Sequence, residues 1–136
     1  MDRSSVQDWL DRYVAAWRAN EPGPIGELFT EDAVYGYRPW DSDEHTVRGR
    51  DAIVASWLEE PDDPDAWEAR YEPYAVEGDR AVAVGWSRYP PTPEAPERMY
   101  HNAYLMRFSP DGRCAEFHEF YMQEGRDPDA TPGPGV

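Results

Sequence analysis

The 136 residues suffice for one domain with a single core, and 40% of them are hydrophobic, so the chain has enough apolar area to fold unaided. The formal net charge of −15 comes from 28 acidic and 13 basic residues, every basic one an arginine, and it argues against nucleic acid and anionic membranes as partners. A single cysteine, Cys114, and the lack of any apolar run of about 20 residues predict a cytoplasmic protein that does not enter the membrane.

The first half of the chain predicts three helices and one short strand. Apolar residues recur at helical spacing from Val6 to Trp17, after a capping-box-like pair, Ser5 and Asp8. Pro22-Gly23 ends that helix, and Pro24 suits the first position of a short second one. A strand is expected over 33–37, followed by an irregular polar segment over 38–48. A third helix should begin at 49–51 and run through 58.

The second half predicts four long strands and a tail. The strands are expected over 67–76, 80–89, 98–108 and 113–123. Residues 90–97 hold four prolines and predict an exposed loop, while residues 125–136 are rich in Gly, Pro and Asp and predict a disordered tail. The domain should therefore span residues 1–124.

This order of elements predicts an α+β domain, with three helices packed on a strongly curved, mostly antiparallel sheet. The concave side of such a sheet would leave a conical cavity, rimmed by loops and the first helix. Both faces of the hairpin over 98–123 carry large apolar residues. Because helices cover only one face, we expect a homodimer through the outer face.

The hairpin over 98–123 also carries the polar candidates. Ser109-Pro110-Asp111-Gly112 predicts the turn, and an idealised hairpin then pairs His101 with Phe120 and His118 with Ala103. Strand alternation puts the two histidines on one face. It puts a different set on the opposite face: Asn102, Tyr104, Glu119 and Tyr121. Alternation does not decide which face lines the cavity, and a bulge would break the parity.

Three residues of this hairpin are candidates for proton transfer. His101 and His118 have the right chemistry near neutral pH, although each could equally be a structural or surface histidine. Glu119 lies between aromatic residues, where its pKa would be raised unless an arginine such as Arg12, Arg38 or Arg50 pairs with it. Aromatic side chains elsewhere either line a pocket for a flat or hydrophobic ligand or form ordinary core. These are Tyr13, Trp17, Tyr35, Trp57, Trp86 and Tyr104.

The sequence contains no motif for a metal site, a phosphate-binding loop or a serine nucleophile. Cys and His do not cluster as metal ligands, and no glycine-rich phosphate loop follows a strand, so no metal and no cofactor is expected. Ser87 follows Gly85-Trp86 inside a predicted strand and lacks the final glycine of a nucleophile elbow. Ser87 is therefore not expected to be a nucleophile.

Several short segments, in this order and spacing, resemble the SnoaL-like branch of the nuclear transport factor 2-like superfamily. They are Ala15-Ala16-Trp17, residues 28–35 (LFTEDAVY), residues 47–53 (VRGRDAI), Gly78-Asp79-Arg80-Ala81-Val82, Asp111-Gly112-Arg113 and residues 116–122 (EFHEFYM). The resemblance covers residues 5 to about 123. The resemblance implies the conical fold. The superfamily includes isomerases, dehydratases, epoxide hydrolases, cyclases and non-catalytic binders.

The resemblance also bears on single residues. In the isomerases of this fold a catalytic aspartate lies near Asp32, although Glu31-Asp32 also suits the end of a helix. Many SnoaL-like proteins end the last strand with an aspartate, where this chain has Met122. Two functions therefore stay open. One is a cofactor-independent isomerase, cyclase, dehydratase or hydrolase that acts on a small hydrophobic molecule through His or carboxylate chemistry. The other is a non-catalytic ligand-binding or dimeric interaction module.

Overall fold

The computed structural model describes residues 1–36 and 46–125, so the predicted tail and Arg38 lie outside the described residues. Within these ranges the helices are α1 (Arg3–Ala19), α2 (Pro22–Glu27) and α3 (Arg50–Glu59). The strands are β1 (Phe29–Gly36), β2 (Thr46–Arg48), β3 (Glu68–Glu77), β4 (Arg80–Tyr89), β5 (Arg98–Phe108) and β6 (Cys114–Gln123).

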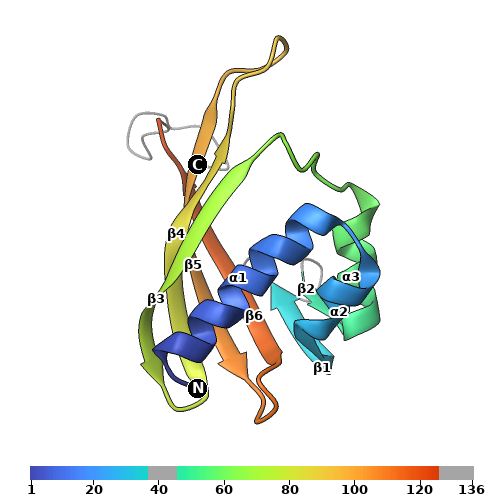
Figure 1. The fold of residues 1–136 in the computed structure, drawn as a ribbon, viewed down its shortest axis with the longest axis vertical. Helices are drawn as coiled ribbons and strands as arrows, with labels where there is room; N and C mark the ends of the chain where they lie inside the picture. Colours follow the sequence, from blue (N-terminus) through green and yellow to red (C-terminus); the bar gives the residue numbers. More distant parts are fainter. Residues whose placement is uncertain (37–45, 126–136) are drawn as a thin grey trace.

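The six strands form one open, curved sheet in the order β2-β1-β6-β5-β4-β3. Only the β1–β6 pair is parallel, and the other four pairs are antiparallel. Figure 1 shows α1 crossing in front of the sheet, with α2 and α3 beside β1 and β2. The predicted α+β architecture, with three helices on a curved and mostly antiparallel sheet, is confirmed.

The start of α1 differs from the prediction by one turn. Asp2, not Ser5, is the N-cap: its carboxylate accepts a 2.8 Å hydrogen bond from the backbone N–H of Ser5, and the Ser5 hydroxyl accepts one of 3.0 Å from the N–H of Asp2. This reciprocal pair satisfies two backbone donors that the first turn leaves free, so the helix begins at Arg3.

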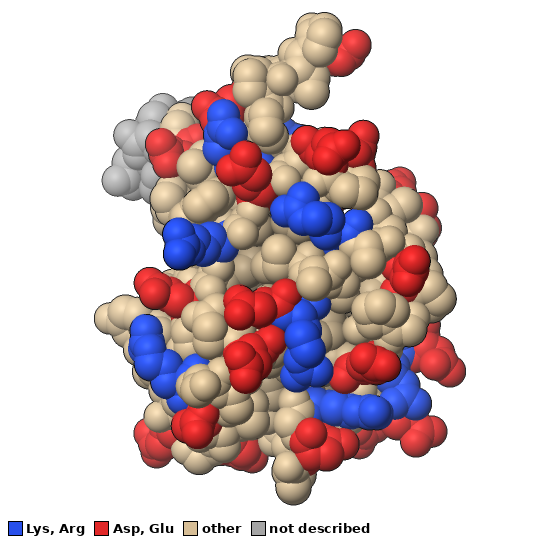
Figure 2. Space-filling view, viewed as in Figure 1, with Lys and Arg blue, Asp and Glu red and all other residues tan. Residues whose placement is uncertain are grey.

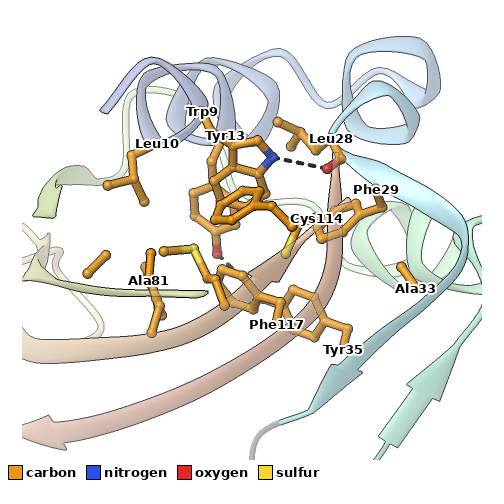
Figure 3. Close-up of a cluster of buried hydrophobic side chains, with 14 of the residues drawn as sticks. Trp9, Leu10, Tyr13, Leu28, Phe29, Ala33, Tyr35, Ala81, Cys114 and Phe117 are labelled. Atoms are coloured by element: carbon orange, nitrogen blue, oxygen red, sulfur yellow. Dashed lines mark hydrogen bonds between the residues drawn. The ribbon is translucent and has the colours of Figure 1, made fainter. Parts of the chain in front are cut away.

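The core lies between α1 and the concave face of the sheet. Trp9 and Tyr13 point from α1 toward Phe117 on β6, and Tyr35 of β1 stacks on the same ring at 4.8 Å between centroids (Figure 3). The indole Nε1–H of Trp9 donates to the Leu28 carbonyl at 3.0 Å. That bond satisfies the one polar atom of a fully buried tryptophan and fixes the end of α2 against α1.

Two strands at the β1 side of the sheet differ from the prediction. β1 begins at Phe29, four residues earlier than expected, and Phe29 is fully buried. The short strand β2 occupies the end of the segment that was expected to be irregular. It pairs with β1 from Val34↔Arg48 to Gly36↔Thr46. Three residues are too few to produce a recognisable alternation in the sequence, which is why the strand was missed.

The β5–β6 hairpin has the predicted turn but a different register. Gly112 adopts a positive φ of 85° and donates to the Ser109 carbonyl at 2.9 Å. The Ser109 N–H donates to the Arg113 carbonyl at 2.8 Å, so the strand pairing begins one residue later than expected, and Ala115 is an extra residue in β6 that adds a second single-residue shift. His101 therefore pairs with Met122, not Phe120, and His118 pairs with Leu105, not Ala103. From Glu116 onward the register has moved by two residues, which keeps each of these side chains on its predicted face.

Candidate functional site

A cavity of about 440 Å³ lies between α1, the end of α3 and the concave face of β3–β6. The face of the hairpin that lines it is the one with Asn102 and Glu119. The lining is polar and aromatic together: Tyr13, Trp17, Asn20, Tyr35, Ser56, Trp57, Glu60, Asp62, Tyr71, Ser87, Tyr89, Arg98, Tyr100, Asn102, Tyr104, Glu119 and Tyr121.

Glu119 is the acidic group on the sheet side of this cavity. It projects from β6, and its Oε1 accepts a 3.1 Å hydrogen bond from the amide Nδ2 of Asn102 on β5. Burial raises the pKa of Glu119 to about 7, and the Asn102 bond opposes that rise only partly. Its partner is an amide and not Arg12 or Arg50, so within the part of the chain that the structure describes no arginine pairs with the carboxyl group to hold it ionised.

A chain of hydrogen bonds fixes the orientation of the Asn102 amide. The hydroxyl of Ser87 on β4 donates to the Asn102 Oδ1 at 3.1 Å. That hydroxyl is also hydrogen-bonded to the phenol of Tyr71 on β3, which must act as the donor because the Ser87 proton is already engaged. With Oδ1 occupied by Ser87, the NH₂ group of Asn102 faces Glu119. Three strands thus contribute to positioning one carboxyl group.

Tyr71 and Tyr104 remain protonated at neutral pH. Burial raises the pKa of Tyr71 to about 12 and raises the pKa of Tyr104 well above its usual value. On the helix side, the hydroxyls of Tyr13 and Tyr35 lie 3.4 Å apart. A cavity with a carboxyl group that titrates near neutrality and neutral phenols nearby has both a proton acceptor and hydrogen-bond donors for an oxygen that gains charge.

The rim of the cavity is formed by the ends of α1 and α3 and the start of β5. Trp17 donates from Nε1 to the Asp62 carboxylate at 3.0 Å, and Asn20 donates to the Asp62 carbonyl at 2.9 Å. Across the rim, the guanidinium of Arg98 lies 4.6 Å from the centre of the Tyr89 ring. The entrance therefore carries one positioned carboxylate and one positioned cation.

Most of the predicted ligand-binding side chains line this cavity. They are Tyr13, Trp17, Tyr35, Trp57, Asn102, Tyr104 and Tyr121. Trp86 does not: it pairs with His101 across β4 and β5, and alternation directs both to the other face of the sheet. The expectation that Trp86 binds ligand is corrected on this ground.

Three of the four predicted catalytic residues lie away from the cavity. His101 is exposed, with its Nε2 2.8 Å from the Glu124 carboxylate, and His118 lies beside Gly36 where β6 meets β1, with a buried Nδ1. Asp32 is exposed on β1 and accepts a 3.0 Å bond from the Thr30 hydroxyl. Alternation and the early start of β1 account for these placements, and Glu119 is the candidate that reaches the cavity.

Sequence reasoning missed Tyr71, Ser87, Tyr89, Tyr100 and Arg98 as lining residues. A signal existed for Ser87, because alternation along β4 places it with Ala81, Ala83 and Gly85 on the side opposite Trp86. Its role became visible only with the register of three strands, which pairs Ala69 with Ser87 and Ser87 with Tyr100 and brings Tyr71 and Asn102 within reach.

The sequence matches the family model described as the SnoaL-like domain over residues 10–117, so the chain belongs to this family. None of the curated proteins matches it. Solved structures with the same fold include a nuclear transport factor 2-like protein of unknown function from Burkholderia xenovorans. The two chains are 18% identical, with 96% of this chain and 89% of that one covered and a TM-score of 0.64.

Two further structures are similar at comparable levels. One is a candidate isomerase from Bacillus subtilis, 14% identical over 90% of each chain, with a TM-score of 0.66. The other is SalBIII, an epoxide hydrolase/cyclase-like enzyme with a role in pyran ring formation in the polyether salinomycin. It is 15% identical over 89% of this chain and 93% of that one, with a TM-score of 0.63. At these identities the similarity shows the fold. None of the helices in the described ranges has the length and apolar character needed to cross a membrane.

Proposed function

We propose that the cavity binds a small, flat organic molecule and that Glu119 exchanges a proton with it, without a cofactor. The observation that carries this proposal is the environment of Glu119, a half-buried carboxyl group held by one amide, with a pKa of about 7. A base of that pKa is partly ionised at neutral pH and is a stronger proton acceptor than an ordinary carboxylate. Isomerisation, cyclisation, dehydration and epoxide hydrolysis all need such a proton transfer.

Tyr104 supports the same proposal. Its neutral hydroxyl lies on the Glu119 side of the cavity, where a substrate that loses a proton to Glu119 gains charge on an attached oxygen. The similar structures described as a candidate isomerase and as an epoxide hydrolase/cyclase-like enzyme fit this reaction class. We also propose that the protein is cytoplasmic, because its single cysteine cannot form an internal disulfide, which fits a reducing compartment.

The test uses 5-nitrobenzisoxazole, a flat substrate that reports on any suitably placed base. Glu119 would remove the proton on C3, the C–H electrons would form the nitrile, and the N–O bond would break to release a coloured phenolate. We expect kcat/KM to rise with pH through about 7, following the ionisation of Glu119. Glu119→Gln should lower it by on the order of 10²-fold.

His101→Ala and His118→Ala are the matched controls, because both histidines lie on the opposite face of the sheet. Both variants should retain the wild-type rate and pH profile. Equal rates in wild type and Glu119→Gln would contradict the proposal. That result, in a protein that still binds the aromatic substrate, would favour the second function, a binding module without catalysis, which the presence of Met122 at the position usual for an aspartate also favours.

A further inference from the structure

Acidic side chains outnumber basic ones in the described lining of the cavity. Three carboxyl groups, those of Glu60, Asp62 and Glu119, face it together with one guanidinium, that of Arg98, among the described lining residues. The whole chain has a formal net charge of −15, and Figure 2 shows acidic side chains spread over the visible face with arginines among them. A concave site inside such a molecule concentrates a negative potential, which attracts cations and repels anions.

The single arginine of the lining is already engaged. Arg98 is exposed at the start of β5, and its guanidinium lies 4.6 Å from the centre of the Tyr89 ring. This contact shows that an aromatic face of the cavity wall holds a cation. Glu119, in contrast, has one oxygen bonded to the Asn102 amide and no ion pair with any arginine of the described ranges 1–36 and 46–125, so among these residues its charge is not compensated.

The remaining walls are aromatic. Among the less buried lining rings, Tyr89 and Tyr100 pack edge to face at 5.8 Å, and Tyr100 and Tyr121 pack edge to face at 5.7 Å. The face of an aromatic ring carries negative partial charge and attracts ammonium groups, and several rings around one carboxylate make a cage suited to amines. The cavity volume of about 440 Å³ accommodates a ligand of roughly ten to twenty non-hydrogen atoms.

We propose that this cavity selects a small organic cation, an aromatic or alkyl amine, over neutral and anionic molecules of the same shape, with the ammonium group placed against Glu119. This inference rests on the proposed function in one respect only, that the cavity is the ligand site. It adds the substrate class, and it holds whether or not the bound amine is turned over.

The groups around Glu119 determine how binding depends on pH. Glu119 is faced by Tyr71 from β3, Tyr89 from β4, Asn102, Tyr104 and Arg98 from β5 and Tyr121 from β6, with Glu60 and Asp62 beyond the end of α3. Burial raises the pKa values of Tyr71, Tyr89 and Tyr104, so these phenols carry no charge near neutrality.

Among the described residues that line the cavity, Glu119 is therefore the group whose raised pKa makes it change charge near pH 7. If a cation binds only when Glu119 is ionised, its affinity should rise about tenfold from pH 6 to pH 8, with proton release on binding below pH 7.

The experiment compares three probes of one shape by titration calorimetry: 2-phenylethylammonium, phenylacetamide and phenylacetate. At pH 8 we expect the ammonium compound to bind at least tenfold more tightly than the amide, and phenylacetate more weakly than either. The affinity of the ammonium compound should be about tenfold lower at pH 6 than at pH 8. Glu119→Gln should abolish this pH dependence, whereas Glu59→Gln, which removes the same charge from an exposed residue of α3 outside the cavity lining, should preserve it.

Two outcomes would overturn the inference. Tighter binding of phenylacetate would show that Arg98 selects the ligand, and equal binding of all three probes would show no selection by charge. The comparison of probes on the wild-type protein stands even if Glu119→Gln fails to fold. Failure here is distinguishable from failure of the proposed function, because the benzisoxazole assay uses a neutral substrate and measures proton transfer.

Discussion

Ionisation of Glu119 opposes folding, because the native environment favours its protonated form. The native pKa of about 7 lies above the reference value of 4.5 that applies to the unfolded chain. Below pH 4.5 both states hold the proton and the group has no effect. As the pH rises to 7, the unfolded state releases the proton first, so the free energy of unfolding decreases, by on the order of 3 kcal/mol when complete.

Glu119→Gln should therefore be more stable than the wild type at pH 8 and similar to it at pH 4.5. Urea denaturation of both proteins at the two pH values measures this difference. Glu59→Gln is the control for net charge, because it is exposed on α3 and should not show the same gain. If the Glu119→Gln variant is no more stable than the wild type at pH 8, the native environment does not raise the pKa of Glu119.

At the scale of single residues, the sequence reduced the candidates on the hairpin to two sets but did not show which set lines the cavity. Alternation along the hairpin separated His101 and His118 from Asn102 and Glu119 correctly. Choosing between the sets required knowing which face meets α1, and both faces carry aromatic residues. The link from Tyr71 through Ser87 to Asn102 depends on the register of β3, β4 and β5, which no local pattern encodes.

The contact between β3 and β4 depends on Gly85. A Cβ atom at this position would lie 2.0 Å from the Arg70 carbonyl oxygen and 2.5 Å from the Tyr71 ring. Both neighbours belong to the strand that supplies Tyr71 to the cavity, and a backbone carbonyl cannot rotate away as a flexible side chain could. The absence of a side chain at Gly85 therefore permits the β3–β4 pairing that positions Tyr71 over Ser87.

Gly85→Ala should lower the free energy of unfolding by about 2 kcal/mol or more, because β3 must move to make room. Gly23→Ala is the matched control: nothing lies within 4 Å of the added Cβ, and Gly23 is within α2, where alanine is the better helix former. Thermal and urea unfolding of the two variants would measure the contrast. Equal stabilities would show that β3 tolerates the side chain.

The elements themselves were largely predictable. The long amphipathic helix and the four long strands were predicted close to their observed bounds, because each has a clear period and is bounded by Gly or Pro. Errors occurred where a tertiary contact determines the structure. β2 exists because β1 offers it a partner, and the hairpin register depends on the extra residue Ala115, for which nothing in the sequence gives a signal.

At the scale of the whole molecule, the outer face of the sheet is exposed and partly apolar. α1 covers the concave face, while the side carrying His101 and His118 has no helix over it among the described residues (Figure 1). Leu105 and Met122 lie on this outer face with 42% and 62% of their surface exposed. Val84 pairs with Ala103, and Ala103 with Phe120, so apolar side chains continue across three strands on this face.

We propose that a second copy of the chain covers this face, since exposed apolar surface that continues across several strands usually marks an interface. An isologous pair would bury Leu105 and Met122 against the same face of the other copy. Sedimentation velocity at micromolar concentration should give the mass of a dimer. Met122→Glu and Leu105→Glu should each convert it to a monomer, because a carboxylate would be buried without a partner. Ala52→Glu, which adds the same charge to an exposed position of α3, should leave the dimer intact. A wild-type protein that sediments as a monomer would contradict the proposal.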